Sequence, residues 1–241
     1  MSVTFTNVHK TLRQKNEKTK VLEDASALFP GDKITGILSP PGGGKTSTVQ
    51  LTTGKLRPDL GSVRRESLVS FPVAGGGVFN NALTGRENLA FLCRVFGFDP
   101  LPIIRFVIDF AEVGKAIDKP MKLLNRDERT RLLFTSCYAI PFETYIVDET
   151  LLGGRGAFRE RCVELVEERM QTSGFLIFTS SPVLLRRYCN AFFTIDRMKI
   201  TPMDSTDDAI AAIGEDRLKF GAGDIEGIDE SSDDTSVINP A

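Results

Sequence analysis

The sequence of 241 residues predicts an α/β fold, in which helices cover both faces of a largely parallel sheet. The first observation is that short apolar strands alternate with helical segments along the chain, an order typical of parallel sheets. The second is a glycine-rich turn at residues 39–47, which directly follows an apolar strand and contains Gly-Lys-Thr. A strand, a glycine turn and a helix in this order indicate a loop that binds phosphate groups.

The length suits one domain with a short appendage, or at most two small domains. The four cysteines are scattered and form no Cys-x-x-Cys pair, so we expect free, buried thiols in a reducing compartment. We expect no signal peptide, and no stretch of 18 apolar residues predicts a membrane span. The net charge of −2 gives no overall attraction to nucleic acid, and none is expected as a partner.

The first elements are expected to be strands. Residues 3–8 alternate apolar and polar side chains and predict a strand, whereas the polar residues 13–20 predict a loop. Residues 21–28 predict a second strand, which ends before a Pro-Gly-Asp turn. Further along, the pattern predicts a strand at 33–38, a helix at 46–54 and a strand at 68–71, before a loop with consecutive glycines.

The middle of the chain is predicted to be helical. Glu87 follows Thr84 by three residues, and Glu128 follows Asn125 in the same way, which is the spacing of a capping box at the start of a helix. The stretch from about residue 84 to 140 is too long for a single crossover connection, so it predicts an inserted helical subdomain. The helices expected within it span residues 84–96, 101–113 and 127–138.

The remainder alternates strands and helices and then changes character. One helical face is predicted by Phe158, Cys162, Leu165, Val166 and Met170, and strands by residues 145–147, 175–178 and 191–195. From residue 214 onward the chain is acidic, and we expect disorder there. We therefore expect a folded domain at 1–213 and an acidic tail at 214–241. The tail is either a solvated chain end or a docking segment for a partner.

The glycine-rich turn carries groups that hold a nucleotide phosphate. Glycines let successive backbone N–H groups point inward, Lys45 adds a positive charge, and the hydroxyl of Thr46 can ligate Mg²⁺. The usual pattern places a glycine where this chain has Ser39. The residues predicted to bind the nucleotide are Ser39, Pro40, Pro41, Gly42, Gly43, Gly44, Lys45, Thr46 and Ser47.

A second motif, an apolar strand that ends in two carboxylates, follows about a hundred residues later. Asp148 is expected to hold Mg²⁺ through water, and Glu149 to polarise an attacking water. Alone, such a pair is equally consistent with capping carboxylates. Together with the phosphate loop, in this order, it predicts ATP and Mg²⁺ as cofactors.

The order of these motifs resembles that of the ATP-binding subunits of ABC transporters. More narrowly, it is similar to the subunits of exporters of capsular and other surface polysaccharides. The resemblance covers roughly residues 3–205, and it is carried by residues 79–89, 148–162, 181–182 and 188–190. The run that follows Glu149 is the most specific part.

The resemblance implies a fold, an activity and partners. The fold would be the P-loop NTPase fold of the ABC type, a mixed sheet with an antiparallel part and an inserted helical subdomain. The activity would be ATP hydrolysis coupled to transport, with Glu149 as the catalytic residue. The subunit would form a homodimer or a heterodimer and bind a membrane permease at the cytoplasmic face of the inner membrane.

The chain departs from the family pattern at several positions. The signature that holds the partner's γ-phosphate, usually Ser-Gly-Gly-Gln, corresponds to residues 125–128, where Asp127 and Glu128 bring negative charge. The structural alternative is that Asn125 caps a helix and both acids favour its first turn. Three further departures are Leu12 at the adenine-stacking aromatic, Asn80 at the Mg²⁺-sensing glutamine and Ser180 near the switch histidine.

Three hypotheses remain open from the sequence. The chain is an active transport ATPase, or a degenerate subunit that binds ATP, hydrolyses it slowly and pairs with a more complete ATPase. The third is an unrelated phosphate-loop protein, such as a small-molecule kinase or a regulatory module. The run from residue 153 to 162 is not expected of a kinase.

Overall fold

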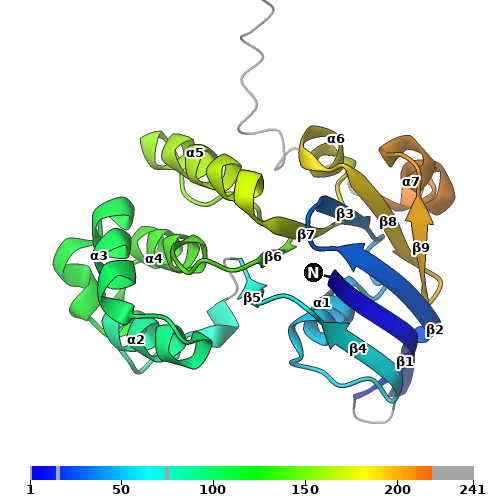
Figure 1. Cartoon of the computed structure of the whole chain (residues 1–241), viewed down its shortest axis with the longest axis horizontal. Coiled ribbons are helices and arrows are strands. Elements are labelled where there is room, and N and C mark those ends of the chain that lie inside the picture. The colour runs from blue at the N-terminus through cyan, green and yellow to red at the C-terminus, as the bar shows by residue number, and fades with distance from the viewer. Residues whose placement is uncertain (1, 15–16, 74–75, 219–241) are drawn as a thin grey trace, which may run out of the picture.

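The molecule contains two β-sheets, of which the smaller lies at an edge of the molecule, while the helices lie mainly around the larger one (Figure 1). The computed structural model describes residues 2–14, 17–73 and 76–218. In these residues one sheet has six strands in the order β5-β6-β7-β3-β8-β9, and the other has three in the order β2-β1-β4. The strands are β1 (Ser2–Gln14), β2 (Glu17–Pro30), β3 (Ile34–Leu38), β4 (Leu60–Arg65), β5 (Val69–Pro72), β6 (Thr144–Asp148), β7 (Gly174–Thr179), β8 (Ala191–Asp196) and β9 (Lys199–Met203).

The six-stranded sheet is parallel except at one edge, where β9 runs antiparallel to β8. Its central strands are buried on both faces, which explains why they read as continuous apolar runs rather than alternating ones. This mixed sheet, with a separate antiparallel sheet and helices, confirms the predicted fold class.

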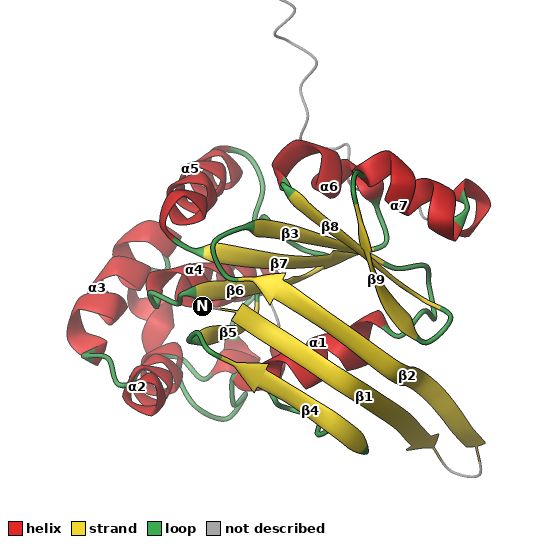
Figure 2. Ribbon diagram, turned by 45° about the vertical axis from the view of Figure 1, so that its right-hand side comes forward, coloured by secondary structure: helices red, strands yellow, loops and turns green. Residues whose placement is uncertain are grey.

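The antiparallel sheet is a long hairpin of β1 and β2 with β4 beside it (Figure 2). The predicted loop at residues 13–20 is wrong where the structure describes it, because Thr11 pairs with Lys20 and Leu12 with Thr19. In this outer part of the hairpin the described polar side chains face solvent, and backbone pairing rather than burial holds the strands, so no apolar pattern marks it. Residues 15–16 lie outside the described residues.

Three helices form a lobe beside the sheets, α2 (Gly85–Phe96), α3 (Pro100–Ala111) and α4 (Arg126–Ala139) (Figure 1). Both predicted capping boxes are confirmed. The Glu87 backbone N–H donates to the Thr84 hydroxyl at 3.1 Å, and that of Glu128 donates to the Asn125 side chain at 2.9 Å. Local capping chemistry therefore fixes where α2 and α4 begin.

The other helices are α1 (Lys45–Thr53), α5 (Ala157–Thr172), α6 (Pro182–Tyr188) and α7 (Thr206–Ile213). The last two, like β4 and β9, were not predicted, because they are too short to show a clear period. The ordered chain continues past the expected boundary at 213, since Arg217 pairs with Asp196 at 2.8 Å and Leu218 is buried. Residues 219–241, which hold most of the expected tail, lie outside the described residues. No helix in the described part combines the length and apolarity needed to cross a membrane.

Successive residues of β6 and β7 feed two different cores. Val147 and Ile177 pack into the core shared with the α2–α4 lobe and α5. Ile146 and Phe178 face the opposite way and pack with α1 and the antiparallel sheet. Because successive side chains of a strand point to opposite faces of the sheet, this one sheet contributes to both cores.

The parallel register brings three loops to one edge of the sheet. Leu38 at the end of β3 lies beside Thr179 at the end of β7, and Asp148 at the end of β6 lies beside Phe178. The segments that follow β3, β6 and β7 therefore leave the sheet together, as expected at the carboxyl ends of parallel strands. The phosphate loop and the two carboxylates belong to these segments.

Arg65 on β4 anchors the far end of the helix that follows the phosphate loop. Its guanidinium donates to the carbonyl oxygens of Thr52 and Leu51 in the last turn of α1. A cation at this position satisfies carbonyls without an intrahelical partner and complements the negative end of the helix dipole.

Replacing Arg65 is expected to destabilise the domain. Arg65→Ala should lower the free energy of unfolding by about 1–2 kcal/mol, which corresponds to a fall in Tm of roughly 2–8 °C for a chain of this size. Arg64→Ala is the matched control, because the Arg64 side chain is 77% exposed and has only a 3.5 Å contact with Glu66. The measurement is thermal unfolding of the wild type and the two variants. An equal fall in Tm in both variants would contradict the anchoring role of Arg65.

Candidate functional site

The phosphate loop has the backbone shape that its glycines require. Gly42 and Gly44 have φ angles of 78° and 101°, in the left-handed region that favours glycine. The Gly43 N–H donates to the Pro40 carbonyl at 2.9 Å and closes the turn. No side chain of the described residues caps the start of α1 at Gly44, so the first-turn N–H groups are available to an anion.

Ser39, the departure from the glycine pattern, fits the loop without strain. It is fully buried, it does not have a positive φ, and its N–H donates to the Thr179 carbonyl at 3.0 Å. Its hydroxyl occupies the space beside Gly43, where an added Cβ would lie 2.5 Å from the Ser39 oxygen. The serine therefore makes Gly43 necessary and leaves the loop shape intact.

Lys45 joins the loop to the two carboxylates. Its Nζ lies 2.8 Å from Asp148 Oδ1 and 2.9 Å from Glu149 Oε1. Burial alone would lower the pKa of Lys45, but the hydrogen bonds that its ammonium group donates to both carboxylates outweigh it and raise the pKa above its usual value. One ammonium group thus neutralises two acids that would otherwise repel each other.

The last residue of β7 and the loop after it also contact Glu149, and no sequence motif indicated this contact. Thr179 Oγ1 donates to Glu149 Oε2 at 2.9 Å, and Ser180 donates through its N–H at 3.1 Å and its hydroxyl at 2.8 Å. Burial would raise the pKa of Glu149, but the hydrogen bonds from Lys45 and Ser180 hold it below its usual value. The only sequence hint was Ser180 near the expected histidine.

These groups line a cavity of about 390 Å³. Of the predicted binding residues, Pro40, Pro41, Gly42, Gly44, Lys45, Thr46 and Ser47 line it, together with Glu149, Ser180, Leu12, Thr19 and Val21. Ser39 and Gly43 do not line it, and Asp148 reaches the cluster through Lys45.

Asn80 is not brought to this cavity. Its side-chain oxygen accepts a hydrogen bond from the Ala82 N–H at 2.9 Å, and its own N–H donates to Asn88 Oδ1 at 2.7 Å. These contacts belong to the turn before α2, so its role as a metal ligand stays a prediction.

Thr46 and Asp148 fit a hard cation. Their donors are a hydroxyl and a carboxylate oxygen, the ligand type that Mg²⁺ takes together with waters and phosphate oxygens. Among the described residues, no group of three or more His, Cys, Asp or Glu side chains is arranged to hold a metal by itself. A cation held by Thr46 and Asp148 would take its other ligands from water or from nucleotide oxygens.

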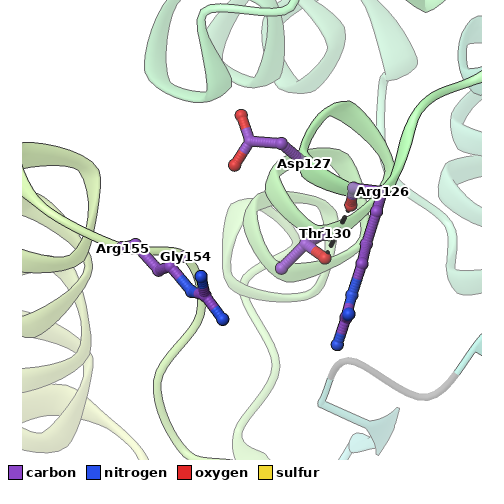
Figure 3. Close-up of a pocket in the computed structure, with 5 residues that line it drawn as sticks. All are labelled: Arg126, Asp127, Thr130, Gly154 and Arg155. Atoms are coloured by element: carbon purple, nitrogen blue, oxygen red, sulfur yellow. Dashed lines mark hydrogen bonds between the residues drawn. The ribbon is translucent and has the colours of Figure 1, made fainter. Parts of the chain in front are cut away.

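The segment that replaces the signature is a helix start. Asp127 pairs with Arg131 at 2.7 Å, and Asn125 and Glu128 form the capping box, which confirms the structural interpretation of these residues. Figure 3 shows Arg126 and Arg155 projecting into a common space, a cavity of about 300 Å³ that Asp127, Thr130 and Gly154 also line. This surface carries cations and a carboxylate where the family pattern has small residues.

The fold and the site define the class of the protein, a nucleotide-binding cassette with a phosphate loop and a carboxylate-ended strand beside it. The cassette fold is shared with solved structures at low sequence identity. The dimeric ATP-binding cassette MJ0796 bound to ADP and Pi superposes with a TM-score of 0.68 at 14% identity, over 82% of this chain and 96% of that chain. No family model matches the chain.

The chain belongs to the ABC transporter ATP-binding proteins and is related to capsule polysaccharide export ATPases. It is 35% identical to the ATP-binding protein BexA of Haemophilus influenzae, over 68% of this chain and 75% of that protein. It is 34% identical to the polysialic acid transport ATP-binding protein KpsT of Escherichia coli, over 76% and 83%. It is 31% identical to the capsule polysaccharide export ATP-binding protein CtrD of Neisseria meningitidis serogroup B, over 78% and 88%. The chain is thus an ABC transporter ATPase.

Lys45→Ala should weaken ATP binding by about 10- to 100-fold, because charge-assisted contacts with the phosphates are lost. Lys33→Ala is the matched control, since Lys33 is exposed and directly precedes β3, at the end of that strand opposite the phosphate loop. Titration calorimetry with ATP measures both. Unchanged affinity in Lys45→Ala would show that the nucleotide does not bind at this loop.

Proposed function

We propose that the chain is the ATP-binding subunit of an ABC transporter that exports capsular or other surface polysaccharide across the inner membrane. Two relatives support the transported class, a polysialic acid transport protein at 34% identity and a capsule polysaccharide export protein at 31%. The observation that carries the nucleotide chemistry is the contact of Lys45 with Asp148 and Glu149, at 2.8 and 2.9 Å. This contact supports the proposal, because a cation suited to binding phosphate lies beside the two acids to which we assign roles in hydrolysis.

Each group of the site has a part in hydrolysis. Lys45 and the first-turn N–H groups of α1 hold the phosphates, while Thr46 and Asp148 hold Mg²⁺. The ion, when bound, offsets the negative charge on the β- and γ-phosphates. Glu149 accepts the proton of the attacking water. Asn80 is the predicted further contact of the ion.

A permease and a second ATP-binding subunit are the proposed partners. Phe91 and Val95, one turn apart on α2, are 61% and 60% exposed. Large apolar side chains on one exposed face suit a protein contact, and we assign this face to the permease. The subunit would then lie at the cytoplasmic face of the inner membrane, as a homodimer or a heterodimer.

A second candidate is a degenerate subunit that binds ATP and hydrolyses it slowly. The observation that favours it is the start of α4, where Asp127 and Glu128 stand in place of the glycine and glutamine of the signature. Negative charge close to a phosphate is unfavourable even in water. In a heterodimer, the site of this chain would be completed by the partner's signature and remain active.

Glu149→Gln should reduce the steady-state rate of Mg-ATP hydrolysis by about 10²-fold or more, because the amide cannot accept a proton. Glu168→Gln on the exposed side of α5 is the matched control and should retain the rate. The assay is run with the subunit alone and with its permease.

The outcomes separate the candidates. Turnover that needs Glu149 supports the active ATPase. If this subunit and its permease, with no other ATPase present, bind the nucleotide but do not hydrolyse it, the chain is the degenerate subunit. Turnover that survives Glu149→Gln would contradict the assignment of Glu149 as the base.

A further inference from the structure

The Glu149 carboxylate is held on two sides by groups of different kinds. On one side stands the Lys45 ammonium, at 2.9 Å from Oε1. On the other stand the donors of the loop after β7, of which the Ser180 hydroxyl, at 2.8 Å, reaches the same oxygen. Thr179 and the Ser180 N–H serve the second oxygen, Oε2. Both oxygens of the acid are therefore engaged.

The second set of donors is built into the fold. Thr179 is fully buried and Ser180 is 5% exposed. The Thr179 hydroxyl accepts a hydrogen bond from the Ser181 N–H at 3.0 Å, which directs its own proton toward Glu149. The strand register fixes this loop beside β6, because the Glu149 N–H donates to the Phe178 carbonyl at 2.9 Å.

Glu149 itself occupies an unusual backbone position. Its φ angle is 63°, in the left-handed region, which is costly for a residue with a side chain and persists only where the surroundings hold it. The conformation turns the side chain toward Lys45 and Ser180. The contacts of the carboxylate are thus part of what holds it there.

The two sets of donors lie on different segments and are expected to separate when a nucleotide binds. Lys45 belongs to the phosphate loop and is expected to leave the carboxylates for the phosphates. Thr179 and Ser180 belong to another segment and have no reason to move with it. After Lys45 leaves, the hydrogen bonds from Thr179 and Ser180 are the contacts that keep the Glu149 carboxylate in place.

We propose that Ser180 is the positioning residue for Glu149, and that it keeps the carboxylate oriented toward the attacking water after Lys45 has moved to the nucleotide. Thr179 is the second hydroxyl that donates a hydrogen bond to the Glu149 carboxylate. The proposal rests on the proposed role of Glu149 as the base. The Ser180 hydroxyl does not titrate near neutral pH. It makes this contact close to the position where the family pattern has a histidine, which this chain lacks.

The test compares Ser180→Ala, Ser180→Thr and Ser181→Ala. Ser180→Ala should lower kcat roughly 10- to 100-fold, the effect of losing one hydrogen bond to a charged group, while KM and the affinity for ATP stay within about twofold of the wild type because the phosphate contacts are intact. Ser180→Thr, which restores a hydroxyl, should recover most of the rate. Ser181→Ala is the matched control, because the Ser181 hydroxyl accepts from the Val183 N–H at the start of α6 and does not contact Glu149.

The pH profile separates positioning from a structural role. The Ser180 hydrogen bond favours the charged carboxylate, so its loss raises the pKa of Glu149 and moves the acidic limb of kcat to higher pH. In a Glu149→Gln background, Ser180→Ala should cause no further loss if it acts through that residue. If Ser180→Ala lowers Tm, Ser180→Cys keeps the side-chain volume with a weaker donor and is measured in its place.

The outcomes distinguish this inference from the function on which it rests. An unchanged kcat and acidic limb in Ser180→Ala, with Glu149→Gln inactive, would overturn the positioning role and leave the base assignment intact. Full activity in Glu149→Gln would refute the base assignment, and the positioning role with it. A lower kcat with a shifted acidic limb in Ser180→Ala supports the proposal.

Discussion

The parallel register of β6, β7 and β3 is the constraint on which the site depends. It places the ends of three strands at one edge, although these ends, at residues 38, 148 and 179, are far apart in the sequence. The phosphate loop leaves from β3, the carboxylates end β6, and Thr179 ends β7 between them. A register shift of one residue in β6 would turn Asp148 to the other face and dissolve the cluster around Lys45.

Charge compensation explains why this edge is stable before a nucleotide arrives. Two adjacent carboxylates at a partly buried position repel each other, and Lys45 is the cation that contacts both. The same ammonium group is suited to phosphate, so the nucleotide competes with the carboxylates for it. When Lys45 exchanges the carboxylates for the phosphates, Glu149 loses its contact with the ammonium group, and nucleotide binding is thereby coupled to the contacts of Glu149. The hydroxyl groups of Thr179 and Ser180 donate hydrogen bonds to the carboxylate that this exchange does not remove.

The sequence predicted what is encoded locally. The phosphate loop, Asp148 and Glu149, and the capping boxes of α2 and α4 each depend on a few neighbouring residues. The hold of Ser180 on Glu149 depends on strand pairing across thirty positions, which no local pattern contains. The outer part of the β1–β2 hairpin was predicted as a loop because its described residues, among them Arg13 and Lys18, are polar and exposed. The contribution of Thr19 to the nucleotide cavity was missed for the same reason. Asn80 was aligned from a family pattern, and the structure places it in a separate turn.

The central claim is that Lys45 changes partners on nucleotide binding while Glu149 stays with Ser180. A crystal structure with Mg²⁺ and a non-hydrolysable ATP analogue tests it most directly. The account predicts Lys45 Nζ within hydrogen-bond distance of a phosphate oxygen and released from Glu149, with the Ser180 hydroxyl still bonded to the Glu149 carboxylate. A bound analogue with Lys45 still on both carboxylates, or a Glu149 side chain that has left Ser180, would contradict it.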